Sequence, residues 1–558
     1  MSATALELYC RDVVSGRQTA CAKVRALCER LLSEVAEGCG KWHFDRRAAE
    51  RPVEFVERFC RVPSGKLGAP MRLEPYEKAW VESMFGFVDD AGNRRVREAL
   101  VTVGRKNGKT SLAAALELYM LTSDGEGSPQ VYNVATTEDQ ARLGFNAACK
   151  MRAMSPEIAR AVKKRRDDLW CDANFGYIRP LTGNPSSMDG LDCHFGVLDE
   201  IHAMRDRDVY DLLRQATGAR RNPLILCITT NGFVRNSIFD SQYAYAADWL
   251  NGKVDDDRFV AWMYELDDKS EWDDEACWAK ANPGLGTVKS ESYMREQVAK
   301  ARQDPTYKPT VMTKDFNMPE NAAQAWLSFD EAVNPVTVGD MSAMGFRYGV
   351  CGFDASDSVD LTSAQMLMKR PGDDNIYELS MYWIPQAVMD EQDEMGRHER
   401  DRAPYRRWIE RGLMRTVPGN KIDKRVLLDW LEEVRDEYDV YTWALGFDPW
   451  HMTEDKLVAD LEAYVGASRV VRVRQGAKTL SAPMKQLRAD YRAHRIVDNH
   501  NPVNEWCRMN VMAKSDVNGN IQPVKLEGNK LNRIDGFAAE LDAYVVLANH
   551  LEEYEQVC

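Results

Sequence analysis

Apolar runs and amphipathic stretches alternate along the chain from about residue 99 to residue 230. Buried parallel strands read as short apolar runs, whereas the helices between them carry apolar residues at intervals of three and four. The strands are expected at 99–103, 131–135, 195–199 and 224–228, and the helices at 111–121 and 138–154. This order predicts an α/β fold built on a parallel sheet.

The first 60 residues carry a helical pattern instead. Val24, Leu27 and Leu31 recur at helical spacing. A turn rich in glycine and proline at 63–70 then interrupts the chain. We therefore expect an N-terminal helical segment at 1–60.

A second series of strands begins after residue 345. The strands are expected at 346–353, 376–383 and 442–447, and the last strong helix opens at 533. The pair Asn334-Pro335 is the expected boundary between the two series. The chain is thus expected to hold one α/β domain at 61–335 and another at 336–558.

Composition narrows the class of protein. The 558 residues are enough for two to four domains, and the 44% of hydrophobic residues indicate a globular chain. Thirteen cysteines are scattered without a C-x-x-C pair, so neither a zinc site nor a disulfide framework is expected. No apolar run reaches membrane-spanning length, and the N-terminus lacks the pattern of a secretion signal. The net charge of -14 argues against a protein that is coated in nucleic acid, but it does not exclude a local basic groove.

The turn between the strand at 99–103 and the helix at 111–121 has the composition of a phosphate cradle. It reads Gly104-Arg105-Lys106-Asn107-Gly108-Lys109-Thr110-Ser111. Backbone N–H groups would face the anion, Lys109 would add a charge, and the Thr110 hydroxyl would hold Mg2+. The usual motif has four residues between its glycines, whereas this turn has three. An ordinary Gly-Lys turn ahead of a helix is therefore the alternative.

Two adjacent carboxylates end the strand at 195–199. Asp199 is expected to hold Mg2+ and Glu200 to polarise the attacking water. Side chains alternate along a strand, so the two carboxylates diverge and can take different roles. Acidic strand ends are also common without any such role.

Other polar residues follow or precede these motifs. Thr229, Thr230 and Asn231 end the next strand, where they could sense a γ-phosphate. Tyr76 lies upstream of the phosphate turn and could either stack on adenine or belong to the core. The basic run at 162–166 fits a solvated face or a contact with DNA phosphates.

Acidic residues mark three element ends in the second series. Asp354 and Asp448 end strands, and Asp535 opens a helix, with Asp360 as a candidate fourth ligand. Converging carboxylates are what two Mg2+ or Mn2+ ions need to cleave a phosphodiester. Spacing alone carries little weight here, because 87 acidic residues offer many such triplets. Asp542 shares the helical face of Asp535, but it is too far along the axis for one metal pair unless the helix lies along the site.

A basic segment lies between Arg469 and Arg495. It holds eight Lys or Arg residues and one acid. The candidate DNA contacts are Arg472, Arg474, Lys485, Arg488 and Arg492. A local excess of positive charge in an acidic protein favours phosphate contacts, and a solvated helix face is the alternative.

Together these motifs resemble the large terminase subunit of tailed bacteriophages, nearly from end to end. That family has a shortened phosphate loop with an arginine ahead of Gly-Lys-Ser/Thr, matched by Arg105. Its coupling motif is matched by Thr229, Thr230 and Asn231. Its adenine motif usually reads Pro-Trp-Gln, whereas this chain reads Pro75-Tyr76-Glu77.

The resemblance implies an N-terminal P-loop ATPase that translocates double-stranded DNA and a C-terminal RNase H-like nuclease that cuts it. Arg105 would stabilise the γ-phosphate, and Asp354, Asp448 and Asp535 would be the acidic triad. The implied partners are DNA, a small terminase subunit and the portal protein of a procapsid. The implied assembly is a homo-oligomeric ring of five subunits, acting in the host cytoplasm and transiently on the procapsid.

Two other functions fit parts of the pattern. A helicase-class translocase would keep the ATPase and use the second domain only to bind nucleic acid. A capsid-associated scaffold with a decayed site would need neither activity. The complete Gly108-Lys109-Thr110 and Asp199-Glu200 motifs argue against the scaffold.

Overall fold

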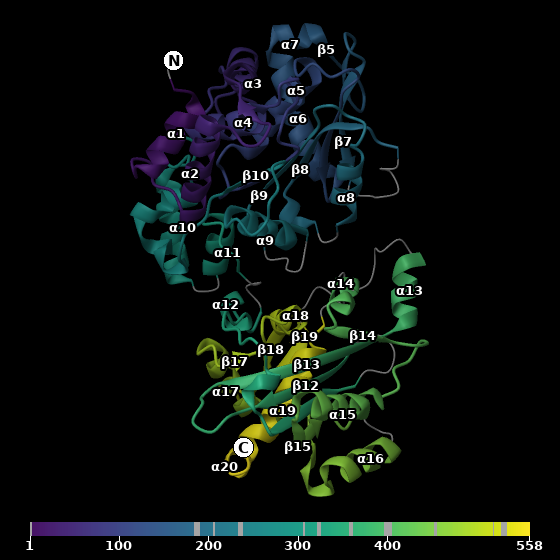
Figure 1. The fold of residues 1–558 in the computed structure, drawn as a ribbon. Helices are drawn as coiled ribbons and strands as arrows, with labels where there is room; N and C mark the ends of the chain where they lie inside the picture. Colours follow the sequence, from purple (N-terminus) through teal and green to yellow (C-terminus); the bar gives the residue numbers. More distant parts are fainter. Residues whose placement is uncertain are drawn as a thin grey trace. The chain divides into compact units, whose positions relative to one another are not determined.

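The computed structural model divides into two compact units, Met1–Glu320 and Asn321–Cys558 (Figure 1). It describes residues 3–182, 190–204, 207–232, 238–304, 307–320, 325–355, 361–394, 404–450, 455–516, 518–525 and 533–558. Within these ranges, no helix is long and apolar enough to cross a lipid bilayer. Each unit has its own sheet and core and is described separately.

The first unit contains eleven α-helices and ten strands within the described residues. Its helices are α1 (Ala5–Val14), α2 (Ala22–Glu37), α3 (Arg46–Phe59), α4 (Pro75–Phe85), α5 (Lys109–Thr122), α6 (Glu138–Met154), α7 (Pro156–Ala161), α8 (Asp208–Gln215), α9 (Ile238–Leu250), α10 (Glu291–Gln303) and α11 (Lys308–Lys314). Its strands are β1 (His43–Phe44), β2 (Phe87–Val88), β3 (Glu98–Thr102), β4 (Gln130–Ala135), β5 (Val162–Lys164), β6 (Leu169–Cys171), β7 (Gly176–Thr182), β8 (Cys193–Asp199), β9 (Leu224–Thr229) and β10 (Phe259–Met263).

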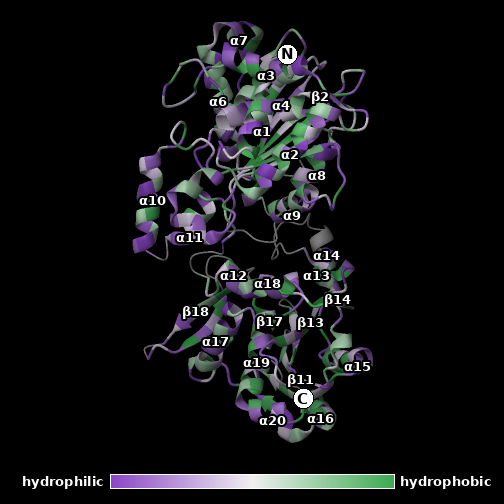
Figure 2. Cartoon of the chain, turned by 60° about the vertical axis from the view of Figure 1, so that its left-hand side comes forward, coloured by the Kyte–Doolittle hydropathy of each residue, from purple (hydrophilic) through white to green (hydrophobic). Residues whose placement is uncertain are grey.

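Eight of these strands form one sheet in the order β10-β3-β9-β8-β4-β7-β6-β5. The pairs from β10 to β7 are parallel, and the pairs β7–β6 and β6–β5 at one edge are antiparallel. Strands β8, β9 and β10 are buried along their whole length, because helices cover both faces. Figure 2 shows the hydrophobic residues gathered on these central strands and hydrophilic ones on the outer helix α10. The predicted parallel α/β sheet is confirmed, and β10 and the β5–β7 edge are additions that the apolar pattern did not reveal.

The N-terminal helices pack onto this unit. Helix α1 contacts α2 and α4, and α2 contacts the edge strand β10. Two side chains tie the segment to the core: Glu34 pairs with Arg95 at 2.8 Å, and the hydroxyls of Tyr9 and Tyr264 lie 3.1 Å apart. The segment at 1–60 is thus part of the first compact unit.

The second unit contains nine α-helices and nine strands within the described residues. Its helices are α12 (Phe329–Ala332), α13 (Gln386–Glu394), α14 (Tyr405–Glu410), α15 (Val426–Tyr438), α16 (Asp455–Val465), α17 (Ala477–Arg492), α18 (Pro502–Met509), α19 (Asp535–Asn549) and α20 (Leu551–Glu555). Its strands are β11 (Tyr348–Asp354), β12 (Thr362–Met368), β13 (Ile376–Pro385), β14 (Met414–Val417), β15 (Tyr441–Phe447), β16 (Val470–Arg472), β17 (Ile496–Val497), β18 (Val511–Ser515) and β19 (Ile521–Lys525).

The main sheet of this unit has the order β14-β13-β12-β11-β15-β16, and β17 also pairs with β13. Strand β12 runs antiparallel to both neighbours, whereas β15 and β16 run parallel to β11. One hydrophobic cluster joins α17, α18 and α19 to one face, and another joins α15 and α16 to the other. This is the expected RNase H-like arrangement. Helix α17 begins at Ala477, directly after Gly476, whose φ of 129° ends the preceding turn.

Candidate functional site

The turn between β3 and α5 carries the expected phosphate loop, from Gly104 to Ser111. Gly108 has a φ of 82°, in the left-handed region, and a Cβ there would lie 2.4 Å from Oε1 of Glu77. Lys106 also has a positive φ, of 65°. Such conformations are strained for residues with side chains and are often found at functional sites. The loop leads directly into the N-terminus of α5, where backbone N–H groups favour an anion.

Lys109, the first residue of α5, is buried beneath this loop. Its side chain is 8% exposed, and its Nζ donates to the carbonyl of Val103 at 3.0 Å. Burial lowers the pKa of Lys109 to about 8, while Glu200 and Asp199 act in the opposite direction. The group therefore remains mostly cationic at neutral pH, as a counter-charge for phosphate must be.

Thr110 and Asp199 meet between the start of α5 and the end of β8. The Thr110 hydroxyl donates to Oδ2 of Asp199 at 3.2 Å. The other carboxylate oxygen, Oδ1, is buried and has no hydrogen-bond partner in the described part of the chain. Burial, and then the neighbouring Glu200, raise the pKa of Asp199 to about 6. A hydroxyl beside a carboxylate oxygen that lacks a donor fits the oxygen ligands that Mg2+ prefers.

Glu200 is connected to Lys314 through the ring of His202. The backbone of Glu200 has a φ of 54°, another strained conformation. Nδ1 of His202 lies 2.8 Å from Oε2 of Glu200, and Nε2 lies 2.9 Å from Nζ of Lys314. An ammonium group can only donate, so Nε2 accepts and Nδ1 carries the ring proton. Nδ1 donates that proton to Oγ1 of Thr229, and the Glu200 carboxylate lies beside it.

These contacts set the charge of Glu200. Burial alone would raise its pKa, but the contact with His202 and the charges of Lys109 and Lys314 lower the pKa to about 2. A carboxylate with so low a pKa is a weak base. It is suited to orienting a water molecule by accepting a hydrogen bond rather than to removing the proton of that water.

The expected coupling residues lie at the end of β9 beside this chain of contacts. Oγ1 of Thr229 lies 2.7 Å from Nδ1 of His202. Thr230 is fully buried, and the carbonyl of Asn231 accepts from Nζ of Lys314 at 3.2 Å. His202 therefore contacts both Glu200 and Thr229, and Lys314 connects His202 to the carbonyl of Asn231.

A separate segment supports the phosphate loop from behind. Nδ2 of Asn107 donates to Oδ1 of Asn282 at 3.0 Å. The same oxygen accepts from Nζ of Lys289, whose fully buried ammonium also pairs with Asp315 at 2.8 Å. The loop is therefore joined to the helical segment that contains α10 and α11.

Tyr76 lies beneath the loop in the protein interior, whereas Arg105 and Lys106 lie on the loop surface. Tyr76 is 2% exposed, its hydroxyl donates to the carbonyl of Asn107 at 3.3 Å, and its ring packs against Trp80. Arg105 and Lys106 are exposed on the surface of the loop. Tyr76 thus supports the loop from the inside, and its stacking on adenine stays a prediction.

Glu77 occupies the position where the resemblance leads one to expect glutamine. It is 4% exposed, and burial raises its pKa to about 7. A neutral carboxylic acid has both a donor and an acceptor, as a glutamine amide does. The protonated fraction of Glu77 therefore retains both hydrogen-bonding functions of the missing amide.

Three of the expected metal ligands meet at one end of the second sheet. Phe353 of β11 pairs with Phe447 of the neighbouring parallel strand β15. Asp354 and Asp448, the next residues, therefore leave the sheet side by side. Asp535 is the first residue of α19, which packs on both strands.

Helix α19 also brings Asp542 to this cluster. The helix lies close along the sheet, since a Cβ on Gly352 would come within 1.9 Å of the carbonyl oxygen of Ala539. Oδ1 of Asp542 accepts from Nε2 of Gln475 at 3.1 Å, and Asp542 contributes to raising the pKa of Asp354. The condition under which Asp542 could share the site, a helix lying along it, is therefore met.

The neighbouring carboxylates raise the pKa of Asp354. Burial, followed by Asp535, Asp542 and Asp448, raises the pKa of Asp354 well above its ordinary value. Like charges this close need protons or a cation between them. No three metal-ligating side chains of the described residues surround one point, so the acids are neighbours without forming a closed cage. Asp360 lies outside the described residues.

Two of the expected DNA contacts flank this cluster. Arg472, at the end of β16, pairs with Phe447 of β15. Arg472 and Arg474 are both exposed. Their backbone positions therefore adjoin the strand end that carries Asp448.

The other three expected DNA contacts lie on α17. Arg488 and Arg492 both pair with Glu331, at 3.0 and 2.5 Å. Lys485 is exposed and donates to a loop carbonyl. Part of the positive charge on this helix is thus neutralised within the protein.

Sequence reasoning did not single out His202, Lys314 or Asn282. His202 stands two residues after Glu200, and Asn282 opens an Asn-Pro-Gly turn, so both carried a local signal. Lys314 carried none, because it is one of many lysines and lies 112 residues from the histidine that it contacts.

Comparisons with known proteins cover both units. Residues 75–248 match the family model described as terminase large subunit, ATPase domain, and residues 253–550 match the one described as terminase large subunit, endonuclease domain. The chain is 29% identical over 507 residues to the terminase large subunit of Enterobacteria phage HK97, covering 88% of this chain and 94% of that protein. It is 26% identical to protein YmfN of Escherichia coli K12, covering 66% of this chain and 82% of that protein.

A solved structure of the same kind also matches. The crystal structure of the HK97 bacteriophage large terminase is 25% identical, with a TM-score of 0.47, over 89% of this chain and 99% of that one. The nuclease family model alone spans more than half of the chain. Neither the helicase-class translocase nor the scaffold is what the family models describe. The chain therefore belongs to the terminase large subunit family and is a phage DNA-packaging motor protein, with an ATPase domain followed by an endonuclease domain.

Proposed function

We propose that residues 104–111 bind the phosphates of ATP, with Lys109 as the counter-charge and with Thr110 and Asp199 as the ligands of Mg2+. The contact between the Thr110 hydroxyl and Asp199, beside the buried ammonium of Lys109, carries this proposal. When bound, Mg2+ neutralises charge on the β- and γ-phosphates. Arg105 is exposed on the same loop, and we assign it the contact with the γ-phosphate.

Glu200 orients the attacking water in this proposal, and His202 and Lys314 are positioning residues. They hold the carboxylate ionised and link it to Asn231. A movement of Thr229, Thr230 or Asn231 would therefore shift the Glu200 carboxylate through His202 and Lys314. A change at the carboxylate on hydrolysis would move these three residues in turn. This contact chain supports a coupling role for the three residues.

Glu200→Gln is expected to bind ATP normally and to hydrolyse it about 10²-fold more slowly or worse, because an amide replaces the charged acceptor. Nucleotide binding is measured with a fluorescent ATP analogue, and turnover by phosphate release. Loss of nucleotide binding itself would instead assign Glu200 to the phosphate or metal site.

His202→Ala tests the positioning role in the same assay. Removing a group that lowers the pKa of Glu200 lets that pKa rise toward its ordinary value. The acid limb of the pH–rate profile is therefore expected to move to higher pH, with nucleotide affinity unchanged. A lower rate with an unchanged pH–rate profile would show that His202 only stabilises the local structure.

For the second unit we propose that Asp354, Asp448 and Asp535 hold the divalent cations of the nuclease, with Asp360 or Asp542 as a further ligand. All these ligands are carboxylates, the hard oxygen ligands that suit Mg2+ or Mn2+. When bound, the ions supply an activated water and stabilise the leaving oxygen. The raised pKa of Asp354 supports a cation at this place, since it marks carboxylates crowded around that group.

We also propose that the nuclease domain begins ahead of the expected residue 336. The compact units divide between Glu320 and Asn321. The rings of Trp326 and Phe537 have their centroids 5.4 Å apart, and the backbone N–H of Trp326 donates to the carbonyl of Val511. These contacts support assigning the segment after residue 325 to the nuclease domain.

Arg472 and Arg474 are proposed as DNA-phosphate contacts of the nuclease. Replacing both by alanine should weaken binding to double-stranded DNA and lower the slope of log affinity against log salt by about 2, because each lost contact removes about 0.9 from the slope. The slope is measured by fluorescence anisotropy over a salt series.

The matched control is Lys421→Ala with Arg425→Ala. This pair removes the same charge from exposed positions on the face that carries α15. Equal effects from both pairs would indicate bulk electrostatics and contradict a specific contact at Arg472 and Arg474. For Arg488 and Arg492 a smaller effect is expected, because Glu331 already pairs with both.

The working assembly proposed for this chain follows from its family. Its partners are double-stranded DNA, a small terminase subunit and the portal protein of a procapsid, and it acts as a homo-oligomeric ring, five subunits by resemblance. The expected place is the host cytoplasm, with transient binding to the procapsid. Family membership supports these partners, and sizing the complex by light scattering with and without procapsids tests the ring.

A further inference from the structure

Strand β13 is paired along only part of one edge. β17 pairs with its first two residues, Ile376 and Tyr377, and β14 pairs with residues 382–385. Within the described chain no strand covers residues 378–381 on that edge, whereas β12 pairs with them on the other. A stretch of four residues, about 13 Å long at 3.3 Å per residue, is therefore left open between two parallel neighbours. Uncovered strand edges of this kind invite pairing with another chain.

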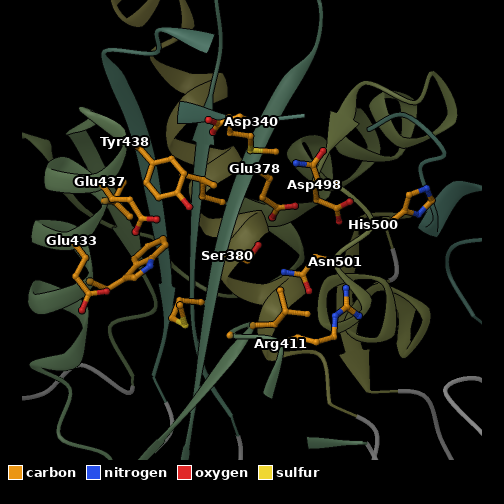
Figure 3. Close-up of a pocket in the computed structure, with 18 of the residues that line it drawn as sticks. Asp340, Glu378, Ser380, Arg411, Glu433, Glu437, Tyr438, Asp498, His500 and Asn501 are labelled. Carbon is orange, nitrogen blue, oxygen red and sulfur yellow. The ribbon is translucent and has the colours of Figure 1, made fainter. Parts of the chain in front are cut away.

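A cavity of about 400 Å³ opens at this gap (Figure 3). All four residues from Glu378 to Met381 line it, together with residues 411–413 ahead of β14 and 498–501 after β17. The ends of the two flanking strands therefore form two of its walls. Figure 3 shows Glu433, Glu437 and Tyr438 on one side of the strand, and Asp498 and His500 on the other.

The lining of this cavity is acidic. Its carboxylates are Asp340, Glu378, Glu433, Glu437 and Asp498, and its basic side chains are Arg411, Arg415 and His500. Two of these basic groups are already paired, Arg415 with Glu433 at 2.7 Å and His500 with Glu505 at 3.1 Å. The cavity therefore favours a cationic occupant.

Two of the carboxylates have an oxygen without a donor. Glu378 is 2% exposed and Asp498 is 5% exposed. Both bind Arg508 behind the cavity, at 2.5 and 2.7 Å, and the same guanidinium also pairs with Glu540 at 2.9 Å. Oε1 of Glu378 and Oδ1 of Asp498 nevertheless have no hydrogen-bond partner in the described part of the chain. The side chains of Glu378 and Asp498 are 0% and 1% exposed, and burial raises the pKa of Glu378 well above its ordinary value. They therefore form the inner acidic wall of the cavity, and the exposed acid Glu437 is one that an occupant can reach.

We propose that this gap receives an extended segment of a partner protein, which adds a short strand to β13 and places a Lys or Arg head group against Glu437, an exposed carboxylate at the wall of the cavity. The open edge supplies backbone donors and acceptors, and the acidic cavity supplies the side-chain specificity, as in other cases of strand addition. A bare metal ion fits less well, because no three metal-ligating side chains of the described residues are grouped to hold one. The inference is independent of the roles proposed above for ATP, DNA and the nuclease metals.

The probe is a fluorescein-labelled five-residue peptide of alternating valine and arginine, titrated by anisotropy against the full-length protein. A peptide with glutamate in place of arginine is the charge control. Two further arginine peptides carry N-methyl groups on either the odd or the even amides, since only alternate amides of an added strand face β13. The arginine peptide is expected to bind, the glutamate peptide not, and one methylated peptide to bind about tenfold more weakly or worse.

Two variants with the same change in net charge locate the site. Glu437→Lys reverses an exposed charge at the cavity wall, and Glu432→Lys reverses an exposed charge on the same helix outside it. Glu437→Lys should weaken binding of the arginine peptide by about fivefold or more, and Glu432→Lys by less than about twofold. Equal losses from the two variants, equal binding of both methylated peptides, or no binding of the arginine peptide would each overturn the proposal.

Discussion

Lys109→Ala is expected to abolish ATP hydrolysis while leaving the fold intact. The ammonium is buried beneath the phosphate loop, where a low local dielectric strengthens its interaction with the β- and γ-phosphates. Removing one such charge from a preorganised site costs about 10²- to 10³-fold in turnover. Phosphate release at saturating ATP measures the loss.

Lys300→Ala is the control for this variant. Lys300 is an exposed lysine on the outer helix α10 of the same unit. It should hydrolyse ATP at the rate of the unaltered protein. Thermal unfolding of Lys109→Ala shows whether the fold survives, and a folded variant that still turns over ATP normally would contradict the phosphate-loop assignment.

The order of strands and helices near the ATPase site was predictable from the sequence. The helix at 138–154 has the expected bounds, and β4, β8 and β9 begin within two residues of the expected starts. Those elements are long or strongly apolar, so periodicity identifies them. Strand β10 was not predicted, because a single apolar run of five residues in a Trp-rich region does not distinguish a strand from a helix.

Contacts between distant segments were beyond the reach of sequence patterns. Lys314 reaches His202 across 112 residues, and Arg488 reaches Glu331 across 157. The residues around each partner give no sign in the sequence that the two will be in contact. The second contact matters for function, because it removes part of the charge that made α17 a candidate for binding DNA.

The acidic cluster shows which information the sequence held and which it lacked. Three acids at element ends were visible in the sequence. Their convergence depends on β11 and β15 being parallel neighbours and on α19 lying close along them, which Gly352 permits. The participation of Asp542 follows from that helix orientation, and no spacing rule supplies it.

Asp354→Ala is expected to reduce plasmid cutting in Mg2+ or Mn2+ to background, and Asp448→Ala and Asp535→Ala should do the same. Each removes a carboxylate from a site whose only proposed ligands are carboxylates. ATP hydrolysis should remain near normal in all three, because the phosphate loop belongs to the other compact unit. Asp436→Ala, which alters an exposed acid on α15, is the control and should cut normally.

The unfolding temperature without metal gives a second, independent test of the same cluster. A carboxyl whose pKa is raised in the folded state makes the protein less stable at pH values above its ordinary pKa, because charging it in place is unfavourable. Asp354→Ala should therefore leave the metal-free stability near neutral pH level or raise it, while removing the stabilisation that added Mn2+ gives the unaltered protein. A variant that cuts normally in Mn2+ would take that residue out of the metal site. If Asp448→Ala alone did so, Asp542 would be the replacement ligand, because it already contributes to the field around Asp354.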